Sequence, residues 1–219
     1  MNTSTPASDL IPLLVAVVAI GLVPFIAMMV TSYTKIVIVL GLLRNALGVQ
    51  QVPPNMVLNG IAIIISVYIM APVGLAAMDT VKEKGLAGGT VAQMGQMAEA
   101  VAEPVREFLV KHAEQRERNF FLKSAAAVWP EERAKQLRDD DLIVLAPAFT
   151  LSELSKAFRI GFLIYIAFVV VDLVVANILL ALGLSQVAPT QISIPFKLLL
   201  FVVMDGWSTL LHGIVLTYR

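Results

Sequence analysis

Long apolar segments alternate with polar stretches along this chain. Apolar runs cover residues 10–43 and 56–78 in the first half, and residues 159–184 and 192–218 in the second half. Each run reaches about the 20 residues that a helix needs to cross the hydrocarbon core of a bilayer. The pattern therefore predicts an all-α membrane-type protein, with two long apolar helical hairpins separated by a charged helical middle region.

The charged residues divide the chain into three parts. Most of the 16 basic and 16 acidic residues lie between Lys82 and Arg159, and their mixed signs predict a water-exposed region without net charge. We expect an N-terminal apolar hairpin over residues 1–78, a charged region over residues 79–149 and a C-terminal apolar hairpin over residues 150–219.

Proline and glycine indicate where the helices of the first hairpin bend or end. Pro24 predicts a kink in the first run and Pro72 a kink or an early end in the second, because proline removes a helical hydrogen bond. Gly48 occupies a plausible C′ position, where a left-handed residue ends a helix. The polar cluster at residues 31–35 suits a helix packed against neighbours better than one surrounded by lipid.

The charged region predicts shorter, amphipathic helices. Over residues 91–123, helical spacing places one set of residues on a common face: Val101, Val105, Phe108, Leu109 and His112. A further short helix is expected to begin at Trp129-Pro130 and to end near Arg138, before an acidic turn at residues 139–141.

Thr150 and Glu153 have the spacing of a capping box, which predicts that the third apolar helix begins there. If this helix reaches Leu182, it spans about 33 residues or roughly 50 Å, against a hydrocarbon core of about 30 Å. Its first turns then project beyond the apolar zone. The residues that form the expected docking stripe on these turns are Leu151, Leu154 and Phe158.

The composition supports the membrane class and excludes several chemistries. The hydrophobic fraction is 58%, against about 45–50% in soluble domains, and the mean hydropathy is +0.83. The formal net charge is zero, so nothing indicates nucleic acid as a partner. The sequence has no Cys, which excludes disulfides, thiolate metal sites and Cys nucleophiles.

No motif for catalysis or for cofactor binding is present in the sequence. The glycines do not form a phosphate-binding loop, and no nucleophile elbow occurs. His112 and His212 are far apart in sequence, and neither has a second metal ligand at helical spacing. We therefore expect a protein that is not an enzyme, and no cofactor or metal site.

Ionisable residues inside the apolar runs give the strongest functional signal: Lys35, Asp172, Lys197 and Asp205. A charge at membrane depth costs roughly 2.5–3.5 kcal/mol, so such residues normally face a partner or a water-filled cavity. We interpret the four as an intramembrane charge network. The alternative is that they lie near an interface and reach out to water, for which the short side chain of Asp172 is poorly suited.

Asp172 and Lys197 carry opposite charges and can neutralise each other. In a straight hairpin centred near residue 188 they are offset by about seven residues, or roughly 10 Å. A pair therefore requires an asymmetric turn, a tilted helix or a partner chain, and it can form within one subunit or between identical subunits.

The positive-inside rule gives the expected orientation. Arg44 in the first short loop places that loop in the cytoplasm, and an even number of spans then places the middle region and both termini in the periplasm of a Gram-negative host. The first apolar run is not preceded by a basic n-region, so we expect it to be retained rather than cleaved as a signal.

Several stretches together resemble the FliP/SctR family of export-apparatus proteins, which serve the bacterial flagellum and the type III secretion injectisome. They are Ser32-Tyr33-Thr34-Lys35, Leu42 to Gly48, Gln51 to Asn55, Pro147-Ala148-Phe149 with Ser152-Glu153-Leu154 and Ala157-Phe158, Asp172 with Ala176-Asn177, and Pro195 to Phe201 with Asp205-Gly206-Trp207. The resemblance covers nearly the whole chain. The start of the chain is more similar to the injectisome branch, with its role in virulence, than to the flagellar one.

The resemblance implies an assembly in the bacterial inner membrane, within the basal body of the secretion system and largely on its periplasmic side. Five copies are expected to join SctS/FliQ-like and SctT/FliR-like subunits in a helical, cone-like export gate. SctU/FlhB-like and SctV/FlhA-like export components, membrane lipid and unfolded protein substrates are the other implied partners. The apolar hairpins would then lie largely within the complex, raised out of the bilayer plane.

The resemblance also implies a pore-constricting loop between the last two apolar runs. The matching residues are Leu184, Ser185, Gln186 and Val187. Family members often have Met in this loop, whose thioethers repack around varied cargo. Here Leu184 and Val187 are expected to supply a less adaptable apolar ring.

Two other functions are compatible with the residues. A small secondary transporter could use Asp172 and Lys197 in ion coupling, and a structural nucleator of the secretion apparatus would contain a pore only incidentally. The export gate accounts for more of the sequence, and its energy would come from other components.

Overall fold

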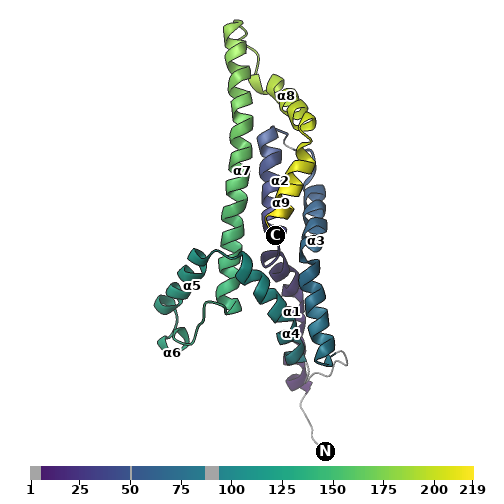
Figure 1. Ribbon diagram of the computed structural model, residues 1–219, viewed down its shortest axis with the longest axis vertical. Helices are drawn as coiled ribbons and strands as arrows, with labels where there is room; N and C mark the ends of the chain where they lie inside the picture. Colours follow the sequence, from purple (N-terminus) through teal and green to yellow (C-terminus); the bar gives the residue numbers. More distant parts are fainter. Residues whose placement is uncertain (1–5, 50, 87–93) are drawn as a thin grey trace, which may run out of the picture.

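The described part of the chain, residues 6–49, 51–86 and 94–219 of a computed structural model, is helical and contains no strand. This confirms the predicted all-α class (Figure 1). The helices are α1 (Pro6–Met29), α2 (Tyr33–Leu47), α3 (Asn55–Glu83), α4 (Met94–His112), α5 (Gln115–Val128), α6 (Glu131–Ala134), α7 (Leu142–Ala181), α8 (Pro189–Val203) and α9 (Gly206–Leu216).

The long helix α7 and the shorter α2 form the most extensive helix pair of the molecule. Ile36, Val39 and Leu40 of α2 are fully buried, and they share one core with residues of α3, α7 and α9. At the closest approach, a Cβ added to Gly161 would lie 2.2 Å from the Leu42 side chain. Glycine therefore allows α7 to contact α2 directly.

The middle region packs at one end of α7. Helix α4 lies against α3 and α7, while α5 and α6 form an arm that projects sideways from the bundle (Figure 1). Phe108 and Leu109 of α4 enter a second core with Leu145 and Phe149 of α7. The division of the chain at residues 78 and 149 stays a prediction, although α7 runs through the second of these boundaries.

The first apolar run breaks at Val30–Ser32, whereas α1 continues through Pro24, where a kink stays a prediction. Gly21–Met29 and Tyr33–Leu47 are bent by 67° at this break. The break leaves carbonyls without helical partners, and the Thr34 hydroxyl donates to Met28 O at 2.8 Å. The Thr150 hydroxyl of α7 lies 3.1 Å from Met29 O. The polar cluster that follows Met29 thus belongs to a helix junction.

The predictions for Gly48 and Pro72 in the first hairpin had different outcomes. Gly48 ends α2 with a left-handed φ of 78°, which confirms its predicted C′ role. In contrast, Pro72 does not end its helix, since α3 continues to Glu83. Packing along α3 thus overrides the cost of one lost hydrogen bond.

The amphipathic helix predicted over residues 91–123 is two helices, which meet at Ala113–Glu114; residues 91–93 lie outside the described part. The Glu114 amide donates to the Ser152 hydroxyl at 2.8 Å, so a contact from α7 fixes this break. Of the predicted face, Phe108, Leu109 and His112 are buried, whereas Val101 is exposed. Helix α6 ends at Ala134, earlier than the expected Arg138.

The capping box predicted at Thr150 is wrong, because α7 begins at Leu142 and passes through Pro147. The Thr150 hydroxyl donates back to Ala146 O within the helix at 2.8 Å. In the predicted docking stripe, Phe158 is 54% exposed and so does not pack on the charged region of its own chain, and docking on a neighbouring subunit stays a prediction. The buried face of these turns contains Ser152, Glu153 and Ala157 instead.

The last apolar run consists of two helices rather than one. Pro189–Val203 and Gly206–Leu216 are bent by 62°. Asp205 at the bend has the left-handed φ of 49°, and a Cβ on Gly206 would lie 2.3 Å from the Phe201 ring. By length and composition α3 and α7 are able to cross a membrane, and each bent pair could be one further span.

Candidate functional site

The four charged residues predicted as one network occupy separate places in the structure. Asp172 and Lys197 meet near the C-terminal end of α2, while Lys35 contacts Glu153 of α7. Asp205 makes no ion pair with any residue in the described part of the chain, and its exposed position at the α8–α9 bend gives it a backbone role. The structure therefore contains two buried charge clusters.

The first cluster joins α2, α7 and α8. Lys197 Nζ lies 2.5 Å from Asp172 Oδ2 and donates to Ala46 O at 3.1 Å. Because Ala46 lies in the last turn of α2, its carbonyl is at the negative end of the helix dipole, which favours a cation. This ammonium is buried, whereas the Asp172 side chain is 37% exposed.

The turn explains how Asp172 and Lys197 can meet within one chain. Asp172 lies nine residues before the end of α7 at Ala181, and Lys197 lies eight residues after the start of α8 at Pro189. The two residues are therefore level along the hairpin. The offset of seven residues resulted from placing the centre of the turn near residue 188, a few residues too late.

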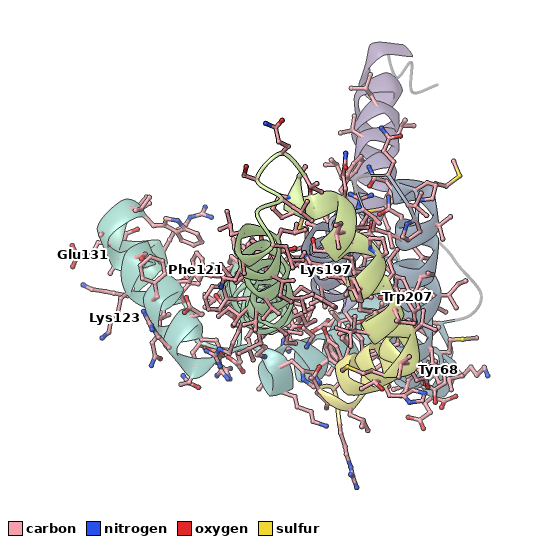
Figure 2. All side chains as sticks on the ribbon, turned by 90° about the horizontal axis from the view of Figure 1, so that it is seen from above. Tyr68, Phe121, Lys123, Glu131, Lys197 and Trp207 are labelled. Atoms are coloured by element: carbon pink, nitrogen blue, oxygen red, sulfur yellow. The ribbon has the colours of Figure 1, made fainter. Side chains whose placement is uncertain are left out.

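A half-open pocket of about 360 Å³, with both polar and apolar lining residues, lies beside Lys197 between the end of α2 and the start of α8. Its lining residues are Asn45, Gly48, Val49, Thr190, Ser193, Ile194 and Lys197. The Ser193 hydroxyl is buried and has no hydrogen-bond partner among the described residues. Figure 2 shows Lys197 among the bundle helices, whereas Lys123 and Glu131 lie out on the α5–α6 arm.

The second cluster is centred on Glu153, whose side chain is completely buried. Its Oε2 atom lies 3.0 Å from Lys35 Nζ and accepts a hydrogen bond from the Tyr218 hydroxyl. The other oxygen, Oε1, lies 3.1 Å from Lys156 Nζ, which also donates to His112 O at 2.7 Å. One carboxylate thus connects α2, α7, the end of α4 and the C-terminal end of the chain.

Aromatic rings cover this cluster. Lys35 Nζ lies 3.6 Å from the centroid of the Tyr218 ring, within the range of a cation–π interaction. The Tyr218 ring also stacks on Phe108 and meets the edge of His112, at centroid distances of 6.1 and 5.2 Å. The pKa of His112 is lowered to about 4, mainly by burial; Glu153 opposes this shift, and the nearby Lys111, Lys156 and Lys35 add to it. Burial and Glu153 raise the pKa of Tyr218.

The sequence analysis missed Glu153 because it assigned this carboxylate to a helix cap. A signal was present in the spacing, since Phe149, Glu153 and Ala157 recur every four residues and so share one face of a continuous helix. Starting the helix at Thr150 concealed that face. Glu153 and Lys156 also have the i, i+3 spacing of neighbours on a helix.

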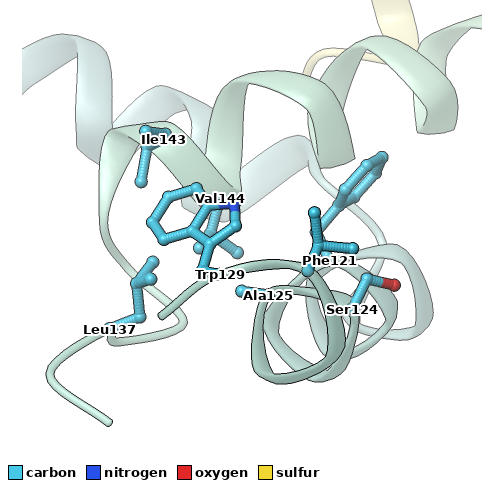
Figure 3. A pocket seen from close by; sticks show the side chains of 8 residues that line it. Phe121, Ser124, Ala125, Trp129, Leu137, Ile143 and Val144 are labelled. Atoms are coloured by element: carbon cyan, nitrogen blue, oxygen red, sulfur yellow. The ribbon is translucent and has the colours of Figure 1, made fainter. Parts of the chain in front are cut away.

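The loop predicted to constrict a pore, Leu184 to Val187, joins α7 to α8 at the end of α7 farthest from the α5–α6 arm (Figure 1). Leu184 is 45% exposed. At the opposite end of α7, the arm forms a small apolar pocket of about 140 Å³ (Figure 3), lined in part by Phe121, Trp129 and Val144. Nothing in its lining suggests catalytic chemistry.

No group of His, Cys, Asp and Glu that could hold a metal ion occurs among the described residues. His112 is buried among aromatic rings and lysines, which makes it a packing residue. His212 lies on α9, outside both charge clusters.

Comparison with known proteins gives one consistent result. The FliP family matches residues 15–214. The hypersensitivity response secretion protein HrcR of Ralstonia nicotianae is 65% identical over 209 residues, which are 94% of this chain and 96% of that protein. Yop proteins translocation protein R of Yersinia pestis is 48% identical over 210 residues, 96% of this chain and 97% of that protein. The virulence protein YscR of Salmonella typhimurium is 42% identical, over 91% of this chain and 92% of that protein.

Proposed function

Because the chain belongs to the FliP family, with type III secretion export-apparatus proteins as its relatives, we propose that it is a core subunit of the export gate. In this role it forms, with copies of itself and with partner subunits, a channel that conducts unfolded protein substrates. The subunit itself has no catalytic role, and other components supply the energy.

The observation that carries this proposal is the bent α8–α9 pair, in which neither helix is long enough to cross a bilayer by itself. Helix α8 has 15 residues and α9 has 11, so they are about 22 and 16 Å long, shorter than a hydrocarbon core of about 30 Å. Their bend exposes large apolar side chains, including Phe196, Leu199 and Val202. Partner helices can cover such faces, and they also permit buried charges at this depth.

The channel in this proposal is narrowed by Leu184 to Val187. The loop is exposed and lies at the tip of the α7–α8 hairpin, where several copies can bring equivalent loops together around an axis. The apolar side chains of Leu184 and Val187 then restrict leakage, while Ser185 and Gln186 keep the ring hydrated.

The assembly contains five copies of this chain together with SctS/FliQ-like and SctT/FliR-like subunits, and it meets SctU/FlhB-like and SctV/FlhA-like components. It lies in the bacterial inner membrane and extends largely to the periplasmic side. Support comes from the family and from the extent of exposed apolar surface on α7 and α8.

Co-expression with the SctS/FliQ-like and SctT/FliR-like subunits, followed by purification in a mild detergent, tests the proposal. We expect a complex that contains several copies of this chain, with a ring or cone visible in particle images. A stable monomer or dimer that moves a small solute would contradict the gate and favour an ion-coupled transporter based on Asp172 and Lys197.

A further inference from the structure

The C-terminal helix α9 is held in the bundle at its two ends by different means. At its start, the chain turns at Asp205, a non-glycine residue in the strained left-handed region. Gly206 is required next, because the Phe201 ring leaves no room for a side chain. This end is therefore a sharp bend that separates α9 from α8.

At its other end, α9 is followed by Thr217 and then by Tyr218. The Tyr218 hydroxyl donates to Glu153 of α7, and its ring covers the Lys35 ammonium of α2. The same ring packs on Phe108 and His112 of α4. A single side chain thus contacts three other helices beyond the end of α9.

Between these ends, α9 depends on apolar packing. Ile214 is 1% exposed and lies in the core with Ile36 and Val39 of α2. The two ion pairs of Glu153 do not involve Tyr218, so Lys35 and Lys156 still neutralise the carboxylate when Tyr218 is removed. Removing Tyr218 therefore leaves the α2–α7 pair with its own contacts.

We propose that Tyr218 is a latch that holds the bent α8–α9 segment closed on the bundle. When its contacts with Glu153, Lys35 and α4 are lost, α9 moves about the Asp205–Gly206 bend while α2 and α7 stay packed. The latch does not depend on the chain being part of an export gate.

Cysteine labelling tests the latch directly, because the chain contains no native Cys. Ile214→Cys places a thiol beneath α9, and Val144→Cys places one in the buried contact of α7 with α5, apart from the core that Ile214 shares with α2. The rate of maleimide labelling of the full chain in detergent is measured with Tyr218, Tyr218→Phe and Tyr218→Ala. Tyr165→Ala, on an exposed face of α7, is the matched control.

We expect Tyr218→Ala to raise the labelling rate at residue 214 at least tenfold and to leave the rate at residue 144 unchanged. Tyr218→Phe should give an intermediate rate, since it keeps the ring over Lys35 and loses only the hydroxyl. An unchanged rate at residue 214 in Tyr218→Ala would overturn the latch. An equal rise at residues 144 and 214 would also overturn it, because the loss of Tyr218 would then loosen the whole bundle and not α9 alone.

Discussion

Lys35 and Lys197 are both buried lysines, but the structure neutralises them differently. Lys35 faces Glu153, whose side chain is fully buried and holds a second ammonium and a phenol as well. Lys197 lines an open pocket and faces Asp172, which is partly exposed, and a helix carbonyl completes the contacts of the ammonium. The first arrangement is closed on all sides, whereas the second keeps access to water or to a partner.

This difference indicates separate roles for the two clusters. A buried pair that loses one partner leaves an uncompensated charge in the interior, which is strongly destabilising. When a partly exposed carboxylate is removed, water can take over part of its hydrogen bonding to the remaining partner. We therefore expect the Glu153 cluster to determine whether the subunit folds, and the Asp172–Lys197 pair to affect how folded subunits fit together.

Glu153→Ala should have the largest effect. It leaves Lys35 buried without a carboxylate, and we expect a loss of about 3–5 kcal/mol in the free energy of unfolding, measured by thermal unfolding in detergent. Glu131→Ala, which removes a carboxylate from the exposed pair with Lys135, is the control and should change stability by less than about 1 kcal/mol. Equal effects of the two substitutions would remove the distinction between the clusters.

Gly161→Ala should weaken both clusters together, because Gly161 lies between Glu153 and Asp172 on α7. The added Cβ would overlap the Leu42 side chain, and overpacking of this kind costs about 1–3 kcal/mol. Gly213→Ala is the matched control, since nothing lies within 4 Å of its added Cβ. If Gly161→Ala is as stable as the control, the close contact between α2 and α7 is not needed.

Asp172→Ala and Lys197→Ala should each lower the free energy of unfolding by about 1–3 kcal/mol, the range for the loss of a hydrogen bond to a charged group. We expect reduced assembly with partner subunits and reduced secretion of substrate by the host cell. The charge-swapped double variant, Asp172→Lys with Lys197→Asp, should recover part of the activity. Full activity of both single variants without any rescue would exclude a role for this pair.

The free energy of unfolding should depend on pH through His112, which lies at the edge of the Glu153 cluster. Its folded-state pKa is lowered to about 4 from 6.5, so the unfolded chain binds more protons between these values and stability falls as the pH drops from about 6.5 towards 4. We expect a loss of about 1–2 kcal/mol by pH 5. In His112→Phe this part of the pH profile should disappear, and an unchanged profile would assign the loss to other groups.

The sequence pattern alone was enough to predict the all-α class, the glycine that ends α2, and Asp172 and Lys197 as candidates for an ion pair. The helix breaks were not predictable in the same way. The junction at residues 30–32 is capped by Thr150, 121 positions away from the Met29 carbonyl that it contacts. The break before α5 likewise depends on Ser152 of α7. These contacts exist only after the helices have packed, as does the burial of Glu153.

The most direct test of the export-gate assignment is photo-crosslinking of a stalled secretion substrate. A photoreactive residue replaces Leu184 in the proposed constriction, and a second variant carries it at Leu173, which is exposed on the side of α7. The assembled apparatus in cells should form a crosslink to the substrate from position 184 and none from position 173. Absence of the crosslink at position 184 in an apparatus that still secretes, or equal crosslinks from both positions, would contradict the assignment of this loop to the channel.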